Sequence, residues 1–175
     1  FLLVLVGKPF LHILLAALLL ASVAPEAGLG SPSGSKKAEL WIEKLNHIEV
    51  ATRIEAREQL LGMGPEVIGP LLAALDSPQW RTRQSAVWLL GELGDRSVAP
   101  RIVRLLQSTA VSDVDRFLGV GTLEKLGGAE AQAALEAALE DPSPSIRNAA
   151  AASLAAKQRE TKAPAKLKGR SCELY

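Results

Sequence analysis

The side chains that most often carry out catalysis or hold metal ions are scarce in this sequence. It contains two histidines, His12 and His47, and one cysteine, Cys172. A Ser or Cys nucleophile needs a nearby base, and a zinc site needs a cluster of Cys and His ligands, so three such residues spread along the chain fit neither. No glycine-rich phosphate loop is present, because Gly127-Gly128 stands where a helix is predicted to close. We therefore expect no enzymatic activity, no cofactor and no metal.

Asp113 and Asp115 come nearest to a cation site. Two carboxylates could hold a cation, but acids are also favoured at the positive N-terminal end of a helix. We interpret both as residues that stabilise the start of the helix that follows them. His47 is interpreted as a turn or capping residue. Cys172 cannot form an internal disulfide, so it is interpreted as an incidental thiol, with a cross-linking or reactive role as the alternative.

Composition favours helices and separates a mildly acidic body from a basic end. Ala and Leu dominate, and aromatic residues make up 4% of the chain, which suits helices better than sheets. Residues 36–156 contain 13 basic and 16 acidic residues, whereas residues 157–175 contain six basic and two acidic ones. Binding of nucleic acid or an anionic surface through the basic end is therefore an alternative function. The body has no interleaved basic and aromatic stripe, so we expect no specific nucleic-acid partner.

The first residues have the pattern of a secretory leader. Their apolar run from Ile13 to Ala24 is twelve residues long, which fits a signal-peptide core of about 7 to 15 residues better than a membrane span of about 20. Lys8 supplies the positive flank of such a core. We interpret residues 1–27 as a signal peptide, which predicts a secreted or periplasmic protein. The alternative is an uncleaved leader that anchors the chain in a membrane.

Three further segments follow the leader. Residues 28–35, GLGSPSGS, have the composition of a flexible linker. Residues 159–175 cluster like charges around Pro164, which indicates a disordered basic tail. Residues 36–158 lie between them and are predicted to form one folded domain.

This domain contains an internal repeat, because four segments align without gaps over a dozen positions. Each repeat starts with an arginine, and the starts are 30, 33 and 31 residues apart: Arg53, Arg83, Arg116 and Arg147. A small residue stands three positions later: Ala56, Ala86, Gly119 and Ala150. A leucine stands seven positions later: Leu60, Leu90, Leu123 and Leu154. A glycine stands eleven positions later in the first three repeats, whereas the fourth has Gln158.

The repeat length is that of one helical hairpin, and apolar residues recur at spacings of three and four within each half. Turn and capping residues fall where hairpins need them, as in Gly64-Pro65 and Asp76-Ser77-Pro78. The predicted helical pairs are 37–46 with 49–63, 66–75 with 80–93, 97–108 with 112–126, and 129–140 with 144–158. A single hairpin cannot bury its apolar stripe, so stacking must make the core continuous.

These segments resemble a known repeat family. DPSPSIRNAAAASL at 141 and DSPQWRTRQSAVWLLGELGD at 76 resemble the turn and second helix of bacterial HEAT-like repeats of the PBS-lyase type, and MGPEVIGPLLAAL at 63 resembles their first helix. The resemblance covers residues 40–158. It implies an all-α fold, a right-handed α-α superhelix of about four hairpins. It also implies that the second helices line a concave face used mostly to bind other proteins.

The resemblance also bears on the arginine column and on the alternatives to binding. The arginines could form an anion ladder or pair between repeats with turn acids such as Asp76 and Asp141, and the resemblance favours pairing. Iron-binding HEAT-like hydroxylases need several His-Glu pairs, which this sequence lacks. Some HEAT-like repeats resemble bilin lyases, which makes a chromophore-handling protein a remote alternative, although a secretory leader argues against it.

One residue-level prediction concerns Trp88. We predict that Ala86, Leu90 and Leu93 face the core. Because successive residues of a helix are about 100° apart, Trp88 should then point about 160 to 200° away from the core. The equivalent positions of the other repeats hold smaller or polar residues, namely Glu58, Gly121 and Ala152. An exposed Trp beside an Arg is a typical interface anchor. We predict a non-enzymatic scaffold for an unidentified protein partner, bound by Trp88, Arg81, Gln84 and Glu92, with packing above Gly121 as the alternative role of Trp88.

Overall fold

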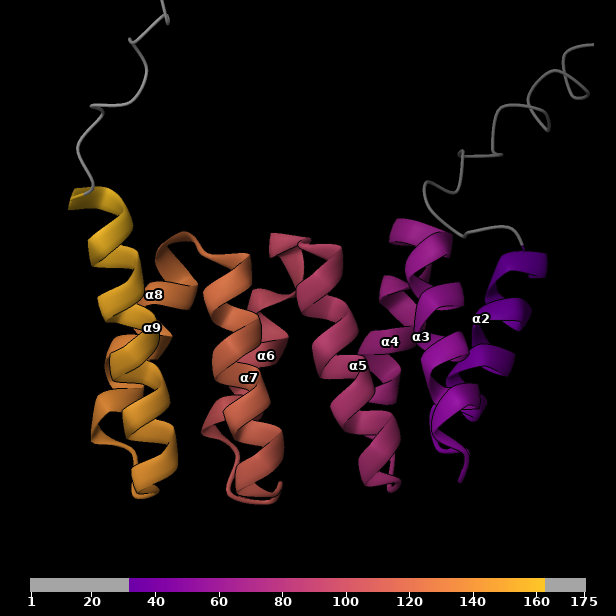
Figure 1. Cartoon of the computed structure of the whole chain (residues 1–175), viewed down its shortest axis with the longest axis horizontal. Helices are drawn as coiled ribbons and strands as arrows, with labels where there is room; N and C mark the ends of the chain where they lie inside the picture. Colours follow the sequence, from indigo (N-terminus) through magenta and orange to yellow (C-terminus); the bar gives the residue numbers. More distant parts are fainter. Residues whose placement is uncertain (1–31, 163–175) are drawn as a thin grey trace, which may run out of the picture. The chain divides into compact units, whose positions relative to one another are not determined.

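A computed structural model describes residues 32–162, and in these residues every regular element is a helix (Figure 1). Four helices occupy the first position of a hairpin: α2 (Pro32–Lys44), α4 (Ile68–Ala74), α6 (Ala99–Gln107) and α8 (Gly128–Ala137). Four occupy the second position: α3 (Val50–Met63), α5 (Trp80–Leu93), α7 (Asp113–Leu126) and α9 (Pro144–Lys162). Short 3-10 turns adjoin three of the first helices: η1 (Gly64–Val67), η2 (Arg96–Val98) and η3 (Ala138–Glu140). The fold is therefore the predicted all-α solenoid of helical hairpins.

The helix boundaries follow from local chemistry. Gly64, Gly94 and Gly127 end α3, α5 and α7 with φ between 62 and 69°, a conformation that costs glycine little because it has no Cβ. Ser112 begins α7 by accepting a hydrogen bond from the backbone N–H of Asp115 (3.2 Å). These are the positions at which the repeat pattern predicted helix ends.

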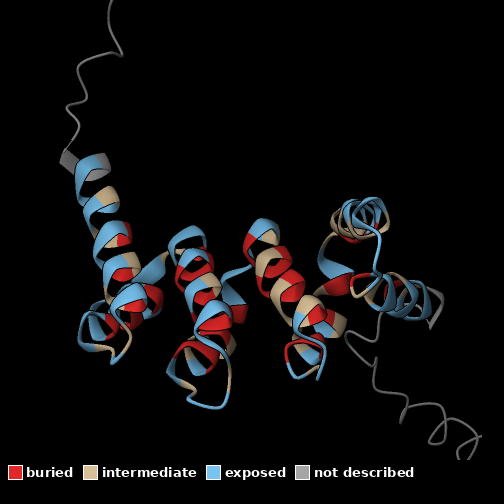
Figure 2. Ribbon diagram, turned by 60° about the horizontal axis from the view of Figure 1, so that its bottom comes forward, coloured by how far each residue is buried: buried red, intermediate tan, exposed pale blue. Residues whose placement is uncertain are grey.

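The second helices of successive repeats pack directly on one another. α5 contacts α3 on one side and α7 on the other, and α7 in turn contacts α9. In Figure 1 these helices stand side by side, and in Figure 2 the buried residues lie on the sides that meet neighbouring helices. Each middle repeat is thus covered from both sides, which is how stacking makes the core continuous.

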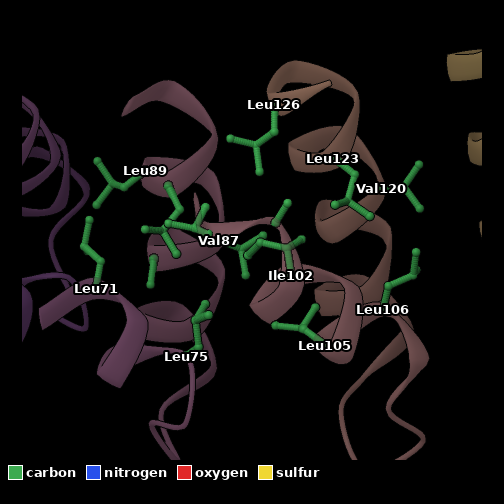
Figure 3. Close-up of a cluster of buried hydrophobic side chains, with 14 of the residues drawn as sticks. Leu71, Leu75, Val87, Leu89, Ile102, Leu105, Leu106, Val120, Leu123 and Leu126 are labelled. Carbon is green, nitrogen blue, oxygen red and sulfur yellow. The ribbon is translucent and has the colours of Figure 1, made fainter. Parts of the chain in front are cut away.

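The predicted core columns are buried. Leu60, Leu90 and Leu123 are 0% exposed, and Figure 3 shows Leu123 among the leucines and valines of α4 to α7. Leu154, in the last repeat, is only partly buried against the same core. The small residues of the other column are all buried: Ala56, Ala86, Gly119 and Ala150.

Both predicted ends of the folded domain need correction. α2 begins at Pro32, so residues 32–35 belong to a helix and not to the predicted linker. α9 continues to Lys162, four residues beyond the predicted end of the domain at residue 158. Extending an existing helix adds one backbone hydrogen bond per residue without a new nucleus, so composition alone underestimates helix length.

The remaining predictions about the ends lie outside the described residues. The predicted signal peptide, the rest of the linker, Cys172 and residues 163–175 all fall there. Among the described residues, no helix is long and apolar enough to cross a membrane.

Candidate partner-binding face

The arginine column holds the turns of the repeats together. Arg53, Arg83 and Arg147 each donate from Nη1 to two carbonyl oxygens of the turn that precedes their own helix, at 2.6 to 3.0 Å. Arg116 instead donates from Nε to the carbonyl oxygen of Leu106 (2.9 Å). These carbonyls are the unpaired acceptors that a turn leaves, and a guanidinium satisfies two of them at once. The arginines therefore have structural partners.

Two of these arginines also bind a carboxylate of the next repeat. Arg83 pairs with Asp115 (3.0 Å), whose side chain is 0% exposed, and Arg116 pairs with Asp141 as well as with Asp113. The predicted pairing between repeats is thus confirmed for Asp141. It is wrong for Asp76, which pairs with Arg101 of α6. Asp115 lies in the first turn of α7 as predicted, but Ser112 caps that helix while Asp115 reaches across to Arg83.

His47 has the predicted role in a turn. Its Nδ1 accepts a hydrogen bond from the backbone N–H of Glu49 (3.2 Å), just before α3 begins.

In the described part of the chain, no group of three or more His, Cys, Asp or Glu side chains is placed to hold a metal ion.

Trp88 is half-buried and packs against the core, so the prediction that it faces outward holds for only part of the ring. α5 lies between α3 and α7, and this double contact buries Val87, Leu89 and Gly91 as well as Ala86 and Leu90. Only a narrow stripe of the helix is left uncovered. Two cations flank the ring: the Arg57 guanidinium lies 5.6 Å and the Lys125 ammonium 5.9 Å from its centroid, within the range of a cation–π interaction.

The other three predicted binding residues do not gather around Trp88. Arg81 lies over the ring of Trp80 instead (4.5 Å). Gln84 is half-buried on α5, and Glu92 forms an ion pair with Lys125 of α7. Of these three residues, only Glu92 is linked to Trp88, and only through Lys125.

A groove of about 1010 Å³ runs from Trp88 across α7 to α9. Gly121 and Ala152, the small residues predicted to stand beside Trp88, both line it. Its apolar lining includes Trp88, Phe117, Leu118, Ala149 and Leu154. Arg81, Gln84 and Glu92 are not among the lining residues. We call this site the Trp88 groove.

Exposed apolar side chains also lie on α3, α5 and α7, and one of them, Phe117, lines the groove. Val50 and Trp80 are equivalent in the repeat, three positions before its arginine, and Ile54 and Phe117 are equivalent one position after it. All four are between 48 and 60% exposed. Together with Trp88 we call them the second-helix face. The sequence reasoning missed this row, although the repeat alignment itself contained the signal.

Comparisons with known proteins agree with this description. Residues 38–117 match the family model for HEAT repeats. Human deoxyhypusine hydroxylase in complex with glycerol is 22% identical, with a TM-score of 0.60 over 76% of this chain and 48% of that one. The complex of CpcE and CpcF of phycocyanin lyase from Nostoc sp. is 19% identical, with a TM-score of 0.42 over 76% and 67%. No curated protein matches this sequence.

Residues 38–117 are therefore HEAT-like repeats, as the resemblance of the turns and second helices predicted. The chain spans about half the length of the human hydroxylase, and at this level of identity the similarity concerns the fold alone.

Proposed function

We propose that this chain is a non-enzymatic scaffold that binds a protein partner on the second-helix face. The observation that supports this most is that exposed apolar side chains recur at equivalent positions of the second helices, next to the apolar lining of the Trp88 groove. Four large apolar side chains are about half exposed on α3, α5 and α7, and Phe117 is both one of these four and a residue of the groove lining. Exposed apolar patches often mark interaction sites in soluble proteins.

The composition of the face also fits a protein interface. Interfaces are enriched in Trp and Arg anchors set in partly desolvated surroundings. Trp80 and Trp88 each lie against an arginine, Arg81 and Arg57 respectively. These contacts favour a subset of ring orientations before a partner arrives, which lowers the entropy cost of binding.

The test is a comparison of two glycine variants of the full chain in affinity capture. A Cβ added at Gly121, in the groove, or at Gly69, on α4 outside it, meets no other atom within 4 Å. Both Gly121→Leu and Gly69→Leu should therefore fold, but only the first fills the groove. We expect a partner protein to be retained by the unchanged chain and by Gly69→Leu, and to be lost with Gly121→Leu. A set of captured proteins that is identical for both variants would contradict the proposal.

A further inference from the structure

We propose that the Trp88 groove takes an acidic, amphipathic segment of a partner protein, with apolar side chains on the groove floor and carboxylates directed to its cationic border. This inference rests on the proposed function and adds the chemistry of the partner. The inference is based on the charged side chains that line the groove, on the hydrogen bonds and ion pairs that these side chains already form, and on the apolar surface beside them.

The groove has the opposite charge to the domain around it. Its lining contains four basic residues, Arg96, Lys125, Lys157 and Arg159, and one acidic residue, Glu124. The other residues of the described range 32–162 contain 12 basic and 16 acidic residues. A local excess of one sign in a concave site attracts segments of the other sign and speeds their association.

Three of the four cations have only neutral partners in the part of the chain that the structure describes. Arg96 donates to the carbonyl oxygen of Leu126 (3.0 Å), Lys157 to the side-chain oxygen of Gln132 (2.9 Å), and Arg159 to the carbonyl oxygen of Ala155 (3.2 Å). Lys125 is the exception, because it pairs with Glu92. The positive charge of Arg96, Lys157 and Arg159 is thus not neutralised by a described carboxylate.

The single acid of the lining is itself engaged. Glu124 accepts a hydrogen bond from the Ser153 hydroxyl (2.8 Å), which ties α7 to α9 across the groove. This bond positions the two walls and leaves the cations as the groups that can bind carboxylates.

Arg57, on the α3 side of Trp88, has the same character. It donates to the Ser85 hydroxyl (3.0 and 3.3 Å), and among the described residues no carboxylate lies within ion-pair distance of it. Burial, and secondarily the charge of Arg53, lowers the pKa of Arg57. A carboxylate docked at Trp88 would therefore gain from a cation that is already partly desolvated.

The apolar surface favours a chain segment over a compact small molecule. The groove alone has a volume of about 1010 Å³. Pockets for drug-sized ligands have volumes of about 300 to 1,000 Å³, so the groove lies at the upper end of that range. Phe117 of the groove lining is one of the exposed apolar side chains of the second-helix face, and Trp80, Ile54 and Val50 lie on the second helices of the preceding repeats. An amphipathic helix can cover such an extended surface with anchors at spacings of three and four residues.

The probes are three fluorescein-labelled ligands of matched length. The first is an amphipathic helical peptide of about 18 residues, the length of five helical turns, with Leu and Phe on one face and Glu on the other. The second carries Lys in place of every Glu, and the third is a single-stranded oligothymidine. Binding to the full chain is measured by fluorescence anisotropy at about 50 and 300 mM salt, which changes the screening of exposed charges.

Two variants and two controls identify the site. Lys157→Glu with Arg159→Glu reverses two exposed cations of the groove, and Lys37→Glu with Arg104→Glu reverses two exposed cations away from it. Gly121→Leu fills the groove, and Gly69→Leu is its control. We expect the acidic peptide to bind to the unchanged chain. The charge reversal at 157 and 159 should weaken binding of this peptide about tenfold at low salt, because charges at the border of a site act chiefly through long-range attraction. Gly121→Leu should weaken it at both salt concentrations, and neither control should.

The other outcomes separate the two proposals. If the basic peptide binds equally well and Gly121→Leu abolishes its binding, the groove binds protein but the acidic partner is wrong. If oligothymidine competes with the acidic peptide and Gly121→Leu has no effect, the site is a polyanion site and the inference is overturned. If neither peptide responds to Gly121→Leu, both the inference and the assignment of the groove as a protein site fail.

Discussion

At the scale of single residues, two helical glycines have opposite roles that a substitution by alanine can separate. A Cβ at Gly91 would lie 3.2 Å from the Thr122 hydroxyl and 3.5 Å from its Cα, where α5 and α7 approach closely. A Cβ at Gly121 meets nothing within 4 Å. The contact at Gly91 is further restrained because the Thr122 hydroxyl donates to the carbonyl oxygen of Val87 (3.0 Å).

Gly121→Ala should therefore raise the free energy of unfolding by about 0.5 to 1 kcal/mol, the propensity difference between Gly and Ala in a helix. Gly91→Ala should lower it by about 1 kcal/mol or more, since overpacking costs about 1 to 3 kcal/mol and exceeds the same propensity gain. Urea denaturation of both variants measures these two changes in the free energy of unfolding. Equal gains in stability would mean that α5 and α7 lie further apart than described.

Trp88 combines packing with exposure, so its removal should affect stability as well as binding. The ring is half-buried against the core and flanked by Arg57 and Lys125. We expect Trp88→Ala to cost about 1 to 3 kcal/mol of stability, less than the 3 to 5 kcal/mol of a fully buried ring. Denaturant melts give this value. An unchanged midpoint would show that the ring stands free of the core and acts as an anchor alone.

At the scale of helices, the inter-repeat ion pairs differ in burial, and this decides their contribution. The Arg116 and Asp141 side chains are 9 and 11% exposed, whereas those of Arg101 and Asp76 are 27 and 73% exposed. Arg116 also satisfies the carbonyl oxygen of Leu106. Removing Arg116 would leave the carbonyl oxygen of Leu106 without this donor and the nearly buried Asp141 carboxylate with the N–H of Ser143 but no cation.

Arg116→Ala should therefore destabilise the fold by about 3 to 5 kcal/mol, the cost of breaking a buried pair by removing one partner. Arg101→Ala, the matched control, should cost less than about 1 kcal/mol because its pair is exposed to water. Thermal and denaturant unfolding distinguish the two. Similar small losses would indicate that water reaches the Arg116 pair.

A substitution in the leucine column and one in the predicted tail should differ in their effect on the stability of the fold. Leu90 is 0% exposed between α5 and its neighbours, so Leu90→Ala should cost about 2 to 5 kcal/mol. Lys168, in the predicted tail, lies outside the described residues, and Lys168→Ala should leave the denaturation midpoint unchanged. Comparable losses in both variants would contradict the repeat register.

At the scale of the whole molecule, we propose that the chain is exported through its apolar leader. The run from Ile13 to Ala24 has the length of a signal-peptide core, and small residues follow it. N-terminal sequencing of the protein from its native cells should find a start between Ala24 and Gly28. Recovery of the intact leader on a cytoplasmic protein would overturn this proposal.

The sequence by itself determined the helices and the repeat. Gly64, Gly94 and Gly127 end helices through their own backbone freedom, and the leucine column follows from the period of an amphipathic helix. These are local properties, which depend on neighbours within a few residues. For this reason the predicted helical pairs agree with the described ones to within about five residues at each end.

Only the tertiary structure decided which surface is left for a partner. Whether Trp88 faces solvent depends on how closely α3 and α7 approach α5. That spacing is set by contacts between residues far apart in the sequence, such as Thr122 with Val87, which are 35 residues apart. The same stacking brings Arg57 of α3 and Lys125 of α7 to the ring. A helical periodicity gives the direction of a side chain on its own helix, but it cannot say which neighbouring helix covers that direction.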